Sequence, residues 1–101
     1  MKKLAVLFIL AALVACSKVL MPTQADADRA TTKFPGTTLA ELNEGKTLYT
    51  DNCGKCHGLK KPTSLNEEGW RKIVPPMAKK AKINAEQEDK ILKYVVTMSA
   101  R

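Results

Sequence analysis

The chain has 101 residues, enough for one small domain. It carries 17 Lys and Arg against 10 Asp and Glu, which gives a formal net charge of +7. Its basic residues are not interleaved with aromatic residues, so the composition argues against a nucleic-acid-binding protein.

The first 15 residues are predicted to be an export signal. Two lysines are followed by an apolar run from Leu4 to Ala15, which is too short to span a bilayer comfortably. The segment Leu13-Val14-Ala15-Cys16 resembles the bacterial lipobox, and that resemblance implies cleavage before Cys16 and acylation of this cysteine. The alternative is an ordinary signal peptide whose cysteine is incidental.

We therefore expect a protein anchored by lipid on the periplasmic side of a bacterial membrane. Two or more acyl chains give stable anchoring. Ser17 stands where an aspartate would, by the same resemblance, direct retention in the inner membrane. This favours the outer membrane.

Residues 16–36 are predicted to form a lipidated N-terminus followed by a tether or a docked arm. They contain Pro22, Pro35 and Gly36 and have no sustained periodicity. As a flexible coil, this segment would have an end-to-end distance of roughly 25 Å. In the alternative, its apolar residues pack on the globular part as an ordered arm: Val19, Leu20, Met21 and Phe34.

Residues 37–101 are predicted to form an all-helical domain, because no strand pattern occurs in them. Thr38 and Glu41 have capping-box spacing, which predicts a first helix that runs to about Asn52. The following residues recur on one face of this helix: Leu39, Leu42, Lys46 and Tyr49.

The segment Cys53-Gly54-Lys55-Cys56-His57 has the C-x-x-C-H pattern that attaches a c-type haem. The thiols of Cys53 and Cys56 would form thioethers with the haem vinyl groups, and His57 would be the proximal iron ligand. A thioredoxin-like pair requires a preceding strand, a zinc site requires a fourth ligand, and a disulfide leaves the only histidine unexplained. One covalent haem c would also stabilise a core of about 65 residues.

Two more helices are predicted after the haem motif. Ser64 and Glu67 have the spacing of a second capping box, and Pro75-Pro76 should break or kink the helix that follows. The apolar face of that helix contains Trp70, Ile73, Val74, Met77 and Ala81. Asn84 is a good N-cap for a last helix, whose apolar stripe contains Ile91, Leu92, Val95 and Met98.

Residues 38–98 resemble a compact class I cytochrome c. The shared features are the haem motif, Gly45, Lys46 and Tyr49 before it, Gly58 after it, and Ile91, Tyr94 and Val95 in the last helix. The resemblance implies three to four helices wrapped around one haem, with the first and last helices crossing where Gly45 meets Tyr94. The interval between His57 and Met77 is shorter than in longer members of the family.

The sixth iron ligand decides the chemistry. His57 is the only histidine, so two histidine ligands cannot come from one chain. Met77, which follows two prolines, is the best candidate; the alternative is that it only packs in the core, and Met98 is the second choice. Ligation by histidine and methionine raises the reduction potential and fills the coordination sphere, so we expect an electron carrier and not an enzyme.

Other residues are assigned from the resemblance. It implies that the carbonyl of Pro62 orients His57 Nδ1–H, and that Trp70 donates to a haem propionate, with core packing as the alternative for Trp70. Two lysine clusters flank the candidate ligands, either as docking surfaces or as ordinary solvated side chains: Lys55, Lys60 and Lys61, and Lys79, Lys80 and Lys82.

The predicted function is a membrane-anchored monohaem carrier that moves single electrons between periplasmic or respiratory partners. Removal of two leader lysines lowers the net charge from +7 to +5, and two haem propionates would lower it further, to about +3. Such a field favours partners with acidic docking surfaces. The alternatives are a five-coordinate gas sensor or peroxidase, and a small haem subunit of a larger electron-transfer complex.

Overall fold

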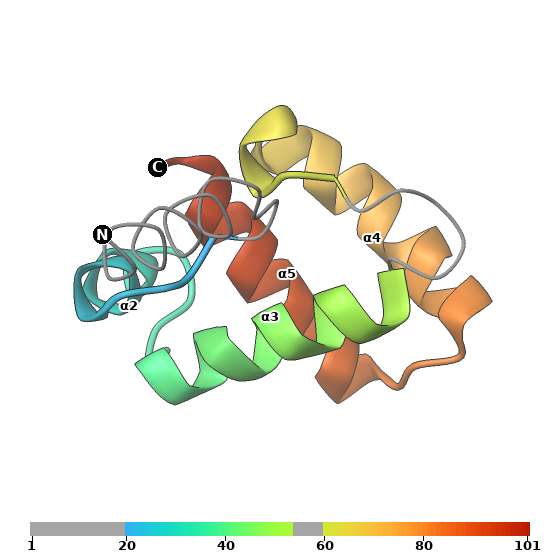
Figure 1. Cartoon of the computed structure of the whole chain (residues 1–101), viewed down its shortest axis with the longest axis horizontal. Helices are drawn as coiled ribbons and strands as arrows, with labels where there is room; N and C mark the ends of the chain where they lie inside the picture. The colour runs from blue at the N-terminus through green and yellow to red at the C-terminus, as the bar shows by residue number, and fades with distance from the viewer. Residues whose placement is uncertain (1–19, 54–59) are drawn as a thin grey trace, which may run out of the picture.

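The computed structural model describes residues 20–53 and 60–101, which fold around one helical core (Figure 1). No strand occurs in these residues, so the prediction of an all-α fold is confirmed. The elements are α2 (Gln24–Ala30), α3 (Leu39–Cys53), the short 3₁₀ turn η1 (Pro62–Ser64), α4 (Glu67–Ala81) and α5 (Ala85–Ser99). Among the described helices, none has the length and apolar character needed to cross a membrane.

Two predicted helix starts are confirmed. At the start of α3, the Thr38 hydroxyl accepts the Glu41 N–H at 3.2 Å, and the Glu41 carboxylate accepts the Thr38 N–H at 3.3 Å. Asn84 caps α5 in the same reciprocal way with Gln87, at 2.8 and 3.0 Å. Each box satisfies two backbone donors that the helix itself leaves without partners.

The capping box predicted at Ser64 and Glu67 is wrong. Ser64 lies in η1, where its hydroxyl donates to the carbonyl of Lys61 at 2.6 Å. The N-cap of α4 is Asn66, whose side-chain oxygen accepts the N–H of Gly69 at 2.9 Å. Asn caps helices as well as Ser does, and the chain turns helical only after Asn66.

Of the break or kink predicted at Pro75-Pro76, the break is wrong, because α4 continues through both prolines to Ala81, and the kink stays a prediction. Each proline removes one hydrogen-bond donor from the helix. The face of α4 that contains Trp70, Val74 and Ala78 is nevertheless buried, and tertiary packing of this kind holds a helix together more strongly than propensity does.

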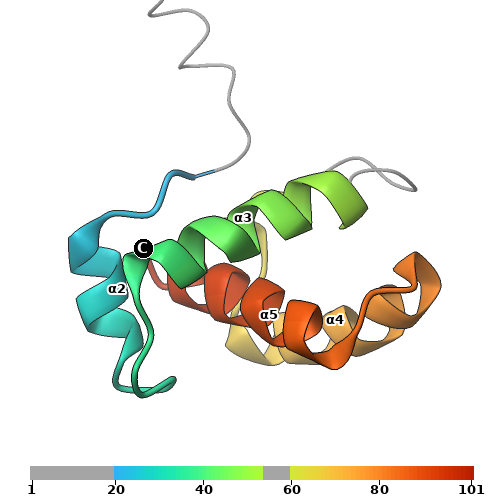
Figure 2. The ribbon, with the colours of Figure 1, turned by 90° about the horizontal axis from the view of Figure 1, so that it is seen from below.

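Among the described residues, the most extensive contact between helices lies where α3 crosses α5 (Figure 2). A Cβ atom added to Gly45 would lie 2.2 Å from the Lys90 carbonyl oxygen and 2.9 Å from Cβ of Tyr94. The predicted meeting of Gly45 with Tyr94 is therefore confirmed. Only glycine permits this approach, since any side chain would overlap the backbone of α5.

Residues 20–36 are packed against the domain, and we call this segment the arm. It contains α2, a seven-residue helix that the sequence analysis did not predict and that begins with a capping box between Thr23 and Asp26. Ala27 and Ala30 are buried, while Leu20 and Phe34 pack against the core. Of the two predicted alternatives, residues 20–36 have the docked arm and not the tether. Met21 was expected to pack and is exposed, and Val19 lies outside the described residues.

Candidate functional site

A cavity of about 500 Å³, here called the α3–α4 cavity, opens beside the C-terminal end of α3. Its volume is in the usual range for sites that hold small molecules. It is lined by Tyr49, Cys53, Lys60, Trp70, Lys72, Ile73, Pro76, Met77 and Lys80. A narrow apolar gap, lined by several of the same residues, continues from this region towards α5.

Cys53 and Met77 line both the cavity and the gap behind it. Cys53 is the last residue of α3 and is half-buried, and burial raises the pKa of its thiol. Met77 comes from α4 and is also half-buried. The first cysteine of the haem motif and the predicted distal ligand are therefore brought to one site from two helices.

The other residues of the haem motif, Cys56 and His57, lie outside the described residues, as do Lys55 and the predicted lipidation site Cys16. Their roles stay predictions. Met98, the second choice as iron ligand, is fully buried in the core and does not line the α3–α4 cavity.

Trp70 is buried and lies between the α3–α4 cavity and the core. Its indole N–H donates to the carbonyl of Pro62 at 2.8 Å, and its ring meets Tyr49 edge-on with 5.8 Å between ring centroids. An indole has only one donor. Because this donor is already used, the structure has the core-packing alternative for Trp70 and not the predicted bond to a propionate. The ring still lines the cavity.

The carbonyl of Pro62 keeps the capacity for a second hydrogen bond, because a carbonyl oxygen has two lone pairs. Pro62 is itself fully buried. The predicted bond from His57 to this carbonyl stays a prediction, and the bond from Trp70 leaves room for it.

The sequence analysis missed the role of Tyr49. Its hydroxyl donates to the carbonyl of Lys60, and burial, followed by the nearby Cys53, raises the pKa of Tyr49 to about 12. Trp70 and Tyr49 thus hold Lys60 and Pro62, where the chain continues after the haem motif. A buried aromatic donor needs a partner, but the sequence does not say which carbonyl supplies it.

Trp70→Phe is expected to destabilise the protein by about 1–3 kcal/mol, because the buried carbonyl of Pro62 loses its described donor. Urea unfolding followed by circular dichroism measures the change. Thr50→Ala is the control: it removes a hydroxyl whose bond to the Lys46 carbonyl is exposed, so it should stay within about 0.5 kcal/mol of the parent. Equal stabilities for the two variants would contradict the prediction.

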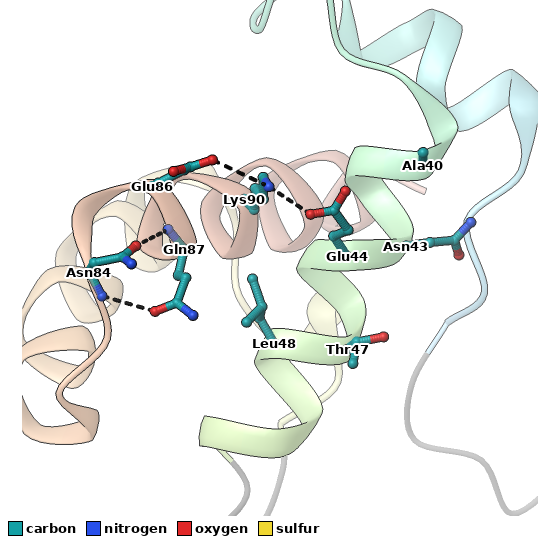
Figure 3. Close-up of a pocket in the computed structure, with 9 residues that line it drawn as sticks. All are labelled: Ala40, Asn43, Glu44, Thr47, Leu48, Asn84, Glu86, Gln87 and Lys90. Carbon is teal, nitrogen blue, oxygen red and sulfur yellow. Dashed lines mark hydrogen bonds and ion pairs between the residues drawn. The ribbon is translucent and has the colours of Figure 1, made fainter.

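A larger open groove of about 700 Å³ lies between α3 and the start of α5 (Figure 3). Lys90 forms an ion pair across the groove with Glu44 at 2.6 Å, and a second one with Glu86 of its own helix at 3.7 Å. Asn84 and Gln87 are hydrogen-bonded to each other. Its charged groups thus already pair with one another, and it contains no thiol or thioether. The α3–α4 cavity is the better candidate in spite of its smaller volume.

Three lysines contribute to the wall of the α3–α4 cavity: Lys60, Lys72 and Lys80. Lys60 and Lys80 were predicted as parts of docking clusters, and Lys72 was not. Lys72 also lies 3.6 Å from the carboxylate of Glu68, and such an exposed ion pair contributes little to the stability of the fold. The predicted neighbours Lys61, Lys79 and Lys82 are exposed as well.

Comparison with known proteins gives one match. The family model described as cytochrome c matches residues 42–100, more than half of the chain. No curated protein and no solved structure matched. The matched range contains the haem motif, the α3–α4 cavity and the crossing of α3 with α5. The chain therefore belongs to the cytochrome c family, whose members bind haem c covalently and use its iron in electron transfer.

Proposed function

We propose that this protein is a lipid-anchored carrier of single electrons, with His57 and Met77 as the axial ligands of one haem c. The observation that carries the proposal is that Cys53 and Met77, from different helices, line one cavity. Haem c supplies a reversible one-electron couple at its iron when bound. Cys53 and Cys56 would attach it, and His57 would hold the iron from the proximal side.

The thioether of Met77 has two roles in this proposal. A soft sulfur ligand favours ferrous iron and therefore raises the reduction potential. It also occupies the position at which a substrate or gas would bind, which favours a carrier over an enzyme. The rigid Pro75-Pro76 segment within α4 supports this role, because it restricts the backbone that presents the sulfur.

The α3–α4 cavity also has a wall suited to electron transfer. Ile73 and Pro76 give it apolar surface, and the rings of Tyr49 and Trp70 are buried behind it. Apolar surroundings limit solvent access and thereby tune the potential of a bound metal centre. The lysines at the cavity favour partners with acidic docking surfaces, and salt should weaken that attraction.

Optical spectroscopy of the purified holoprotein tests the ligand set. A low-spin spectrum with the sulfur-to-iron charge-transfer band, unchanged by carbon monoxide in the reduced state, is the expected result. A high-spin ferrous form that binds carbon monoxide at once would reject the proposed ligation. The gas sensor or peroxidase would then be the leading interpretation.

Membrane attachment through Cys16 is the second part of the proposal, and it would place the protein on the periplasmic side of a bacterial membrane. Cys16→Ser is expected to move the protein from the membrane fraction to the soluble fraction, since the acyl chains supply the anchor. Ser17→Ala is the matched control and should stay with the membrane. Intact mass should show a mature N-terminus at Cys16 with its acyl chains; unchanged fractionation of Cys16→Ser would reject the anchor.

A further inference from the structure

We propose that the arm is the membrane-facing surface of this protein, and that it holds the domain against phospholipid headgroups by the end opposite the α3–α4 cavity. The inference rests on the proposed lipidation of Cys16. It goes beyond anchoring, because it states which surface meets the lipid and how closely.

The start of the arm is fixed to the last helix. The hydroxyl of Tyr94, a fully buried residue, donates to the carbonyl of Leu20 at 2.7 Å, and Arg101 donates to the carbonyl of Met21 at 3.4 Å. Only four peptide steps join Cys16 to Leu20, so the chain between them reaches at most about 14 Å. A free coil over residues 16–36 would instead let the domain move away by roughly 25 Å.

The middle of the arm is held by Asp26, whose side chain is only 5% exposed. Its carboxylate accepts the N–H of Thr23 at 2.8 Å and a guanidinium N–H of Arg29 at 2.7 Å, and Arg101 lies 3.7 Å away. Although burial opposes ionisation, these hydrogen bonds hold the pKa of Asp26 below its usual value. Arg29 also donates to the carbonyl of Thr97 in α5 at 3.0 Å, which joins α2 to the last turn of that helix.

The end of the arm is held by α4. Phe34 packs against the core, and the guanidinium of Arg71 lies 5.5 Å from the centre of its ring. Lys33 pairs with Glu67 in the first turn of α4. The arm is therefore attached at its start, middle and end, and it does not act as a spacer.

The surface at this end has the chemistry of a membrane contact. Met21 is 62% exposed and is the one large hydrophobic residue exposed in the described part of the chain. Arg29, Lys33 and Arg101 keep 39–53% of their side chains exposed. Cations are attracted to an anionic lipid surface, although Asp26 lies beside Arg29 and Arg101, and Glu67 pairs with Lys33.

The Cys53 end of the α3–α4 cavity lies away from α2 and the C-terminus. Helix α3 begins beside the arm and ends at Cys53, and its 15 residues span about 21 Å along the axis. Figures 1 and 2 both place α2 and the C-terminus at one end and the Cys53 end of α3 at the other. With the arm on the lipid, the cavity and its lysines remain open to a partner in the aqueous phase.

The test uses lipidated holoprotein in vesicles of phosphatidylcholine and phosphatidylglycerol, with and without a lipid that carries a headgroup quencher. Met21→Cys and Lys80→Cys each introduce one free thiol for a fluorescent label, because the native cysteines would be occupied by lipid and haem. We expect the quencher to lower the emission at position 21 severalfold more than at position 80. Fluorescence lifetimes measured without the lipid quencher correct the ratio at each position for quenching by the haem itself.

Two further variants make the test specific. A 16-residue Gly-Ser insertion between Val19 and Leu20 should remove most of the quenching at position 21. Ala27→Asp, which charges a residue that is 1% exposed, should undock the arm and open Arg29 and Lys33 to trypsin. Equal quenching at positions 21 and 80, or no change on insertion, would overturn the inference.

The same samples distinguish this inference from the proposed function. The optical spectrum reports the haem ligands, and intact mass with vesicle flotation reports the lipid. Protein that floats and has the expected spectrum, yet shows equal quenching at both positions, would overturn the membrane-facing arm alone. Protein without acyl chains would overturn the anchor and with it the inference, while the electron-carrier assignment would stand on the spectrum.

Discussion

Met77→Ala is expected to convert the haem iron from a six-coordinate low-spin state to a five-coordinate state that binds carbon monoxide when reduced. The sulfur-to-iron charge-transfer band should disappear, and the reduction potential should fall. Axial ligands set haem potentials over about 0.8 V, so loss of one ligand is among the largest changes that a single substitution makes. Optical spectra and a redox titration measure both effects.

Any change seen in Met77→Ala alone could come from the lost iron ligand or from lost packing, because truncation of a packed methionine also leaves a void. Met→Ala in a core costs about 2–5 kcal/mol, and less where the side chain is half-exposed, as Met77 is. Met77→Leu keeps the volume and removes only the sulfur, at a cost below about 1.5 kcal/mol. It should therefore reproduce the spectral change and the fall in potential without the additional cost of a void.

Met98→Leu is the matched control for the choice of ligand. Met98 is fully buried in α5 and does not line the α3–α4 cavity, so this variant should keep the charge-transfer band and the potential. If the band disappears in Met98→Leu and persists in Met77→Leu, the assignment of the distal ligand is wrong. If the band persists in both, the sulfur ligand is neither of them.

The features of this protein that could be predicted from sequence were those fixed by local chemistry. The capping box of Thr38 with Glu41 and the N-cap Asn84 both bond residues three positions away, and both were predicted. The crossing of Gly45 with Tyr94 was predicted only through the family resemblance, since nothing near Gly45 in sequence identifies its partner.

The errors have a common physical cause, which is that tertiary contacts override local signals. Pro75-Pro76 opposes a helix, yet the buried face of α4 keeps the helix continuous. For the arm, which has no sustained periodicity, the sequence left a tether and a docked arm open; Arg29 and the hydroxyl of Tyr94 dock it on α5. For the indole of Trp70, the resemblance implied a propionate as partner, with core packing as the alternative, and the structure has the carbonyl of Pro62 as the partner.

Gly45→Ala is expected to destabilise the protein by about 3 kcal/mol, which for a domain of this size lowers the melting temperature by roughly 12–24 °C. The new Cβ would lie 2.2 Å from the carbonyl oxygen of Lys90, closer than real Cβ contacts come. Because that atom belongs to the backbone of α5, relief requires the two helices to separate. The better helix propensity of alanine returns only about 1 kcal/mol.

Gly69→Ala is the matched control, because it makes the same change in a helix with room for it. Its Cβ would lie 3.3–3.4 Å from side-chain atoms of Leu65 and Asn66, which need to shift by only a few tenths of an ångström. Thermal unfolding followed by circular dichroism should place Gly69→Ala within about 1 kcal/mol of the parent. Near-equal melting temperatures for the two variants would show that α3 and α5 pack less closely than described. A selective loss with Gly45→Ala would instead show that this crossing stabilises the fold in which Cys53, at the end of α3, and Met77 line one cavity.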